Sequence, residues 1–145
     1  MICTFFGHKA TPFDIKDKLK NTLVSLIEKQ GAKVFYVGNQ GNFDIIVRHI
    51  LEELKNEYSH IDYTVVLAYM PTVKKDNDFL DYNKTIYPDI LHNTPRKFAI
   101  SKRNKWMIDK SNFVITYVKC NTGGAAKFES LAKKMNKMVI NIAEL

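Results

Sequence analysis

The sequence opens with Ile2-Cys3-Thr4-Phe5-Phe6-Gly7, a short, nearly continuous apolar run that stops at a glycine. Runs of this kind are typical of strands buried on both faces of a parallel sheet. Two later runs end in the same way: Val34–Val37 before Gly38 and Gly41, and Phe113–Val118 before Gly123 and Gly124. The carboxyl ends of parallel strands meet at one edge, where such folds bind ligands, and glycine there leaves backbone N–H groups open to phosphate. The glycines therefore predict a ligand site at this edge.

Helical periodicity between these runs makes strands and helices alternate along the chain. The expected strands are residues 2–6, 33–37, 62–69, 112–118 and 138–142, and the expected helices are residues 14–30, 42–58, 98–110 and 125–136. This alternation predicts a Rossmann-like α/β three-layer sandwich, with a five-stranded parallel sheet in the order 3-2-1-4-5 and helices on both faces. The topological switch point then lies between the first and fourth strands, which brings Gly7-His8 close to residues 121–124.

The length and composition of the chain limit the class of protein to which it can belong. The 145 residues include 46% hydrophobic and 26% charged side chains, as expected of one globular domain spanning 1–145. No run of about 18 apolar residues occurs, and the first residues have the pattern of a strand, so we expect neither a membrane span nor a cleavable leader. We therefore expect a cytoplasmic protein with no membrane partner. Cys3 and Cys120 are expected to be reduced interior thiols. They and His8 lack the spacing of metal ligands, so neither a metal nor a cofactor is expected.

The net charge of +7 has two interpretations. It favours a nucleic-acid surface on electrostatic grounds. The lysines are nevertheless spread along the chain without an arginine-rich tract, which favours scattered, solvated side chains and leaves nucleic acid as a less favoured partner. Residues 70–97 form a further irregular stretch, with three of the four prolines. Loops of such length are usually functional, and this one is predicted to be a loop or lid over the site.

Three segments carry the candidate chemistry. In Gly38-Asn39-Gln40-Gly41-Asn42-Phe43-Asp44, Asn42 is a candidate helix N-cap and Asp44 lies in the first turn, so the segment is either a well-built turn or part of a site. It is not a dinucleotide fingerprint, which needs three spaced glycines after the first strand. Asn121-Thr122-Gly123-Gly124-Ala125 opens a helix and predicts an anion seat, the alternative being close helix–sheet packing.

The third segment surrounds Arg103, whose planar guanidinium suits bidentate contact with phosphate. Trp106 either packs in the core or stacks on a base, and His8 either contacts a ligand or packs beside Gly7. No nucleophile–base pair can be identified. Asp44 and Glu129 are the weak catalytic candidates for acid–base work.

Taken in order, Phe5-Phe6-Gly7-His8-Lys9, the segment 38–44, and Arg103–Asp109 followed by Gly123-Gly124-Ala125-Ala126 resemble the YpsA-like branch of the SLOG superfamily, whose relatives include the SMF/DprA and "Lonely guy" proteins. The resemblance spans nearly the whole chain. It implies a Rossmann-like domain that binds nucleotides or nucleotide-derived molecules at the strand tips. Other members of the superfamily sense such ligands in bacterial nucleotide signalling and in anti-phage systems, without turnover.

The "Lonely guy" relatives hydrolyse nucleoside 5′-monophosphates, using an arginine and a Gly-Gly-x-Gly-Thr-x-x-Glu loop. Arg103 matches that arginine by position, whereas the loop here reads Gly123-Gly124-Ala125-Ala126-Lys127-Phe128-Glu129. The third glycine and the threonine are replaced, and Glu129 comes one residue early. One residue is about 100° of helix rotation, so Glu129 is expected to point away from the family's catalytic position. The comparison favours binding of a nucleotide without hydrolysis over its hydrolysis.

The leading hypothesis is therefore a protein that binds a phosphorylated nucleotide-derived molecule, as a sensor, carrier or sequestering protein in bacterial or phage signalling. The alternatives are a nucleoside-monophosphate N-glycosidase and a DprA-like single-stranded nucleic-acid binder. A homo-oligomer is also expected. The expected ligand-binding residues are Gly7, His8, Lys9, Gly38, Asn39, Gln40, Gly41, Asn42, Asp44, Arg103, Asn104, Trp106, Asn121, Thr122, Gly123, Gly124 and Ala125.

Overall fold

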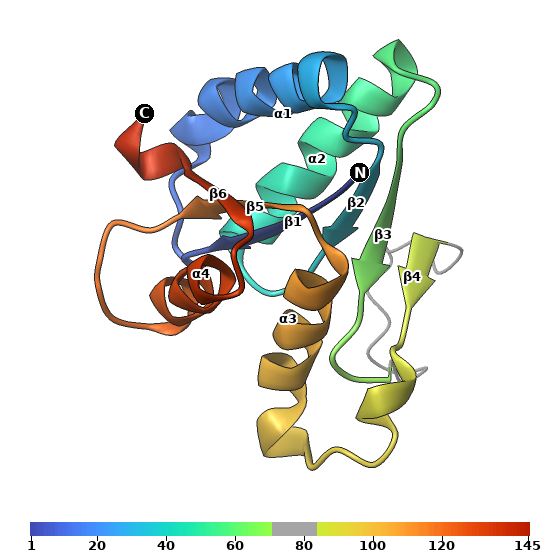
Figure 1. Cartoon of the computed structure of the whole chain (residues 1–145), viewed down its shortest axis with the longest axis vertical. Coiled ribbons are helices and arrows are strands. Elements are labelled where there is room, and N and C mark those ends of the chain that lie inside the picture. The colour runs from blue at the N-terminus through green and yellow to red at the C-terminus, as the bar shows by residue number, and fades with distance from the viewer. Residues whose placement is uncertain (71–83) are drawn as a thin grey trace.

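A computed structural model describes residues 1–70 and 84–145 of the chain. In this part a single parallel sheet carries helices on both faces (Figure 1), in the strand order β4-β3-β2-β1-β5-β6. The strands are β1 (Ile2–Gly7), β2 (Val34–Val37), β3 (Asp62–Val66), β4 (Thr85–Ile86), β5 (Phe113–Tyr117) and β6 (Met138–Asn141). The class, a Rossmann-like α/β fold with a parallel sheet, is as expected.

The expected sheet of five strands is wrong in strand number, and its order therefore differs from the observed one. The additional strand is β4, which pairs with β3 through Val65–Thr85 and Val66–Ile86 at the edge of the sheet. Two residues are too few to show a periodic pattern, and β4 lies within the proline-containing stretch 70–97. Of that stretch, residues 71–83 lie outside the described residues. After β4 it continues as two single turns of 3-10 helix, Asp89–Leu91 and Arg96–Phe98.

Among the described residues, four α-helices connect the strands: α1 (Lys16–Gln30), α2 (Asn42–Glu57), α3 (Ala99–Lys110) and α4 (Gly124–Lys134). Helices α1 and α2 cover one face of the sheet, and α3 and α4 cover the other (Figure 1). A turn of 3-10 helix, Phe13–Ile15, precedes α1. Helix α1 ends at Gly31, which has a φ of 74° in the left-handed region that glycine adopts without strain.

The two faces of the sheet bury separate cores because successive side chains of a strand point to opposite sides. In β1, Cys3 and Phe5 join the core under α1 and α2, and the intervening Phe6 joins the core under α3 and α4. Strand β5 divides in the same way, with Ile115 on the first face and Val114 on the second. Both faces of the central strands are thus apolar, as their continuous hydrophobic runs predict.

The central strand β1 has β2 on one side and β5 on the other. The chain leaves β1 towards α1 on one face and leaves β5 towards α4 on the other face (Figure 1). The loops after these strands therefore separate at the carboxyl edge, which is the geometry that opens a crevice in such folds.

The expectation that both cysteines are interior is right for Cys3, which is buried, and wrong for Cys120, which is exposed in the loop after β5. None of the described helices is long and apolar enough to cross a membrane. Within the same described residues, no three histidine, cysteine, aspartate or glutamate side chains are placed to share a metal ion.

Candidate functional site

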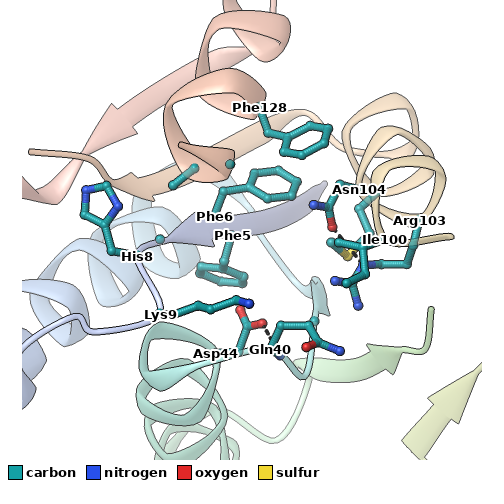
Figure 2. A pocket seen from close by; sticks show the side chains of 15 residues that line it. Phe5, Phe6, His8, Lys9, Gln40, Asp44, Ile100, Arg103, Asn104 and Phe128 are labelled. Carbon is teal, nitrogen blue, oxygen red and sulfur yellow. Dashed lines mark hydrogen bonds between the residues drawn. The ribbon is translucent and has the colours of Figure 1, made fainter. Parts of the chain in front are cut away.

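A pocket of about 250 Å³ lies at the carboxyl ends of β1 and β2, between α3 and the first turn of α4 (Figure 2). Its lining combines charged, polar and apolar side chains from segments far apart in the sequence. They are Phe5, Phe6, Gly7, His8, Lys9, Gly38, Gln40, Asp44, Ile100, Arg103, Asn104, Met107, Gly124, Ala125 and Phe128.

Many of the residues expected from the sequence meet in this pocket. Those that line it are Gly7, His8, Lys9, Gly38, Gln40, Asp44, Arg103, Asn104, Gly124 and Ala125. Those that do not are Asn39, Gly41, Asn42, Trp106, Asn121, Thr122 and Gly123. The catalytic candidate Glu129 also lies outside it. The pocket therefore divides the candidates into residues that a small molecule in it would touch and residues that lie outside it.

Arg103 is the buried cation of the pocket, with only 2% of its surface exposed. Its Nη1 donates to the backbone oxygen of Val66 at 2.9 Å, and its Nε donates to Oδ1 of Asn104 at 2.8 Å. Of the five N–H groups of a guanidinium, three are left without a partner among the described residues. The two bonds fix the plane of the guanidinium, and the remaining donors are available to an anion.

Asp44 is the carboxylate of the pocket and is 7% exposed. Its Oδ2 accepts a hydrogen bond of 2.8 Å from the backbone N–H of Gln40. Burial raises the pKa of Asp44 to about 6, against the opposing effects of that N–H group, Arg103 and Arg48. In turn, burial lowers the pKa of Arg103, while Asp44 acts to raise it. Strongly perturbed ionisable groups in a cleft are characteristic of functional sites.

The start of α4 supplies backbone donors to the pocket. Gly123 has a φ of 98°, the helix begins at Gly124, and no side chain caps it. The first N–H groups of a helix have no partner within the helix and attract anions. A Cβ atom added to Gly124 would meet no atom within 4 Å, so the space beside this turn is open. Asn121, Thr122 and Gly123 precede the turn in the exposed loop.

His8 holds the two loops at the switch point together. Its Nε2 accepts a hydrogen bond of 3.0 Å from the backbone N–H of Lys119, and its ring lies edge-on to Tyr117, with ring centroids 6.1 Å apart. Because Nε2 is the acceptor, the neutral imidazole carries its proton on Nδ1. The next residue back along the chain, Val118, is held at both its N–H and its carbonyl oxygen by the Asn141 side chain, at 3.0 and 2.9 Å.

The apolar wall of the pocket was not among the expected site residues. Phe6 and Phe128 stack with ring centroids 5.6 Å apart, and Figure 2 shows this pair on the side of the pocket opposite Asp44 and Gln40. Ile100 and Met107 of α3 also contribute. In the sequence, the apolar character of these four residues indicates only that they belong to the hydrophobic core. The signal that could have found them is helical spacing, since Ile100 and Met107 lie three before and four after Arg103 on the same helix face.

Gly41 and Asn42 have structural roles beneath the site. Gly41 has a φ of 88°, and a Cβ atom there would lie 2.7 Å from Cα of Lys9. The backbone N–H of Asn42 donates to the carbonyl oxygen of Lys9 at 2.9 Å. The side-chain Nδ2 of Asn42 donates to the carbonyl oxygen of Thr11 at 3.4 Å. The expectation that Asn42 is the N-cap is wrong, because the helix begins at Asn42 and Gly41 is in the cap position. Asn39 lies beside the pocket with its Oδ1 buried and unpaired among the described residues.

Trp106 and Glu129 both lie outside the lining of the pocket. An α-helix turns about 100° per residue, so Ile100, Arg103 and Met107 share one side of α3 and Trp106 lies on the neighbouring side. There its ring packs against Tyr36, with centroids 5.2 Å apart. Glu129 accepts a hydrogen bond from Oγ1 of Thr116 in β5 and lies 3.5 Å from Nζ of Lys133.

The model of the YspA SLOG family matches residues 2–143 of this chain. No curated protein matches it. The match runs from β1 through β6 and so includes every element that lines the pocket. With nearly its whole length covered, the chain belongs to the YspA SLOG family.

Proposed function

We propose that this protein binds a phosphorylated, nucleotide-derived small molecule in the pocket at the carboxyl ends of β1 and β2, and acts as a sensor, carrier or sequestering protein for it. One observation carries the proposal. The buried guanidinium of Arg103 and the open first turn of α4 line the same pocket. Membership of the SLOG family is consistent with a nucleotide-related ligand.

The phosphate fits the side of the pocket where positive charge and free donors are combined. Arg103 offers a pre-oriented fork of N–H groups, and such groups form short, strong bonds to phosphate oxygens. The N–H groups at Gly124 add the positive end of the helix dipole. Lys9, exposed at the mouth of the pocket, adds a second cation.

The remaining surfaces suit a sugar and a base. Oδ1 of Asp44 and Nδ2 of Asn104 have no partner among the described residues, and they offer one acceptor and one amide donor group to hydroxyl or ring atoms. The stacked pair Phe6 and Phe128 presents an apolar wall. A volume of about 250 Å³ lies just below the usual ~300–1,000 Å³ of small-molecule sites, so one nucleotide unit suits it better than a polymer.

Calorimetric titration with the common nucleoside 5′-monophosphates, each paired with its nucleoside, tests the proposal. We expect at least one monophosphate to bind about tenfold or more tightly than its nucleoside, because the phosphate contacts dominate. Binding of neither member of any pair would contradict the proposal. Native mass spectrometry of the purified protein would search in parallel for a retained ligand outside this panel.

Two variants localise the binding. Gly124→Ala adds a methyl group into open space, so it should leave the fold intact and weaken the monophosphate about tenfold by crowding the phosphate. Arg103→Lys keeps the charge but loses the planar guanidinium, so it should weaken binding of the monophosphate to a similar extent. Asn121→Ala, in the exposed loop outside the pocket, is the matched control and should change nothing. Equal affinities for all three variants would place the ligand elsewhere.

A hydrolytic function is the second candidate, and Asp44 is the observation that favours it. A buried carboxyl group whose pKa is raised to about 6 lies in the pocket beside Arg103, where it can stabilise a developing ribosyl cation. Glu129 is bonded to Thr116 instead. Incubation with the same monophosphates, followed by chromatography for free base, decides the matter. Absence of base release by the wild type would remove this candidate.

A further inference from the structure

A second, open groove of about 490 Å³ runs along the flank of α3 that carries Trp106. Its apolar floor comes from three separate segments: Ile90 of the 3-10 turn after β4, Trp106 of α3, and Met135 at the end of α4. Lysines 102, 105 and 110 surround this floor. The groove and the pocket of the proposed function have no lining residue in common, so the two sites are separate.

The positive charge of the groove is not neutralised within the described part of the chain. Elsewhere lysines form ion pairs, such as Lys16 with Glu53, Lys55 with Asp62 and Lys84 with Glu52. None of the ammonium groups in the groove has a carboxylate within ion-pair distance among the described residues. Asp109 is the acidic residue of the lining. The groove therefore holds three cations and one anion around an apolar floor.

Trp106 is placed as an anchor rather than as a stacking platform. Its half-buried ring packs on Tyr36 at a centroid distance of 5.2 Å, and Nζ of Lys110 lies 5.8 Å from its centroid. Stacking of a flat base needs a whole open ring face, whereas Tyr36 and Lys110 leave only part of the ring to an incoming apolar side chain. An apolar centre with an aromatic residue, bordered by polar groups, is the usual anatomy of a protein interface.

We propose that this groove docks an acidic peptide segment of a partner protein, which places one or two apolar side chains on Ile90, Trp106 and Met135 and pairs its carboxylates with the three lysines. Charge complementarity selects this occupant, since such fields steer an acidic partner towards the groove. A second copy of this chain, with its net charge of +7, is less complementary to the three lysines than an acidic segment is.

The test uses Trp106, the only tryptophan in the chain, as an intrinsic reporter. The protein is titrated at low salt with a short synthetic peptide of glutamates and leucines, and the tryptophan fluorescence is followed. We expect a saturable change that weakens as salt is added, since exposed charges are screened. A matched peptide with glutamine in place of glutamate should bind at least about tenfold more weakly. No saturable change, or equal binding of both peptides, would overturn the proposal.

Charge reversals locate the contact. Lys105→Glu should weaken the acidic peptide about tenfold, whereas Lys29→Glu, on α1 across the sheet, should change its affinity by less than about twofold. Equal effects of the two reversals would show a non-specific charge effect and overturn the site. A thymidine oligonucleotide forms the last arm. If it bound more tightly than the peptide with the same sensitivity to Lys105→Glu, the occupant would be nucleic acid and the proposal would be wrong.

Discussion

Gly38 and Arg103 meet in the pocket so closely that a Cβ atom on Gly38 would lie 3.2 Å from Nη1 of the guanidinium. The same atom would lie 2.8 Å from Oδ2 of Asp44. The backbone after β2 thus passes directly against the buried cation and the buried carboxylate of the site. Both side chains are held in place by backbone groups, Arg103 by Val66 and Asp44 by Gln40, so neither has free room to move aside.

Gly38→Ala should therefore disturb both the site and the fold. We expect a loss of about 1–3 kcal/mol in the free energy of unfolding, because the methyl group must displace hydrogen-bonded side chains. The affinity for the monophosphate identified by calorimetry should fall about tenfold or more. Urea unfolding and calorimetry measure the two effects. An unchanged affinity together with an unchanged stability would mean that Arg103 and Asp44 shift freely.

Gly7→Ala tests the packing at the end of β1. A Cβ atom there would lie 2.2 Å from Cγ of Phe43, a fully buried ring of the core under α2. Since that ring cannot move without opening the core, we expect a loss of about 3 kcal/mol or more. Gly124→Ala, which has open space around it, is the matched control and should leave the urea midpoint nearly unchanged. Similar midpoints for the two variants would contradict the packing described.

Asp44→Asn tests the buried carboxyl group through pH. The pKa of Asp44 is raised from 3.8 to about 6 in the fold, so the folded protein binds a proton more tightly than the unfolded chain does. This contribution stabilises the fold at low pH and is lost as the pH rises from about 4 to about 6. The variant has no such group. Its unfolding free energy should match wild type near pH 3 and exceed it by up to about 3 kcal/mol at pH 7. A constant difference across this range would show that Asp44 does not titrate as described.

Asn141→Ala tests how the loop before α4 is held. The Asn141 side chain accepts from the N–H groups of Val118 and Ala143 and donates to the carbonyl oxygen of Val118. Removal of this side chain leaves three backbone groups, the N–H and carbonyl oxygen of Val118 and the N–H of Ala143, without a hydrogen-bond partner. The free energy of unfolding should therefore fall by about 2–3 kcal/mol. Asn141→Asp keeps the acceptor and loses the donor. Its stability in urea unfolding should therefore lie between that of Asn141→Ala and that of the wild type. Full stability of Asn141→Ala would mean that water replaces the side chain.

The parts of the fold that could be predicted are those with a long, regular signal. The continuous apolar runs of β1 and β5 and the helical spacing of α1 and α2 each depend on burial of a whole element, so the pattern survives in the sequence. Strand β4 has two residues and no such pattern. It exists because Val65 and Val66 of β3 present a free edge to Thr85 and Ile86.

The candidate site was predictable to the extent that it follows from strand ends. Gly38, Asp44, Arg103 and Gly124 were expected from their places after strands or on the preceding helix, and all line the pocket. Trp106 was expected beside them, but its ring packs against Tyr36 and lines the other groove. Phe128 was missed because apolar character alone does not distinguish a core ring from a pocket wall.

The sequence by itself determined the alternation of strands and helices, the edge at which the pocket lies, and the family, because these depend on local patterns and on the order of segments along the chain. Only the tertiary structure decided which side chains share a pocket. That choice depends on how far each helix is rotated about its axis and on how β1, β2, α3 and α4 pack together. Such packing brings Arg103 to Gly38 and Glu129 to Thr116, contacts between residues that no local pattern relates.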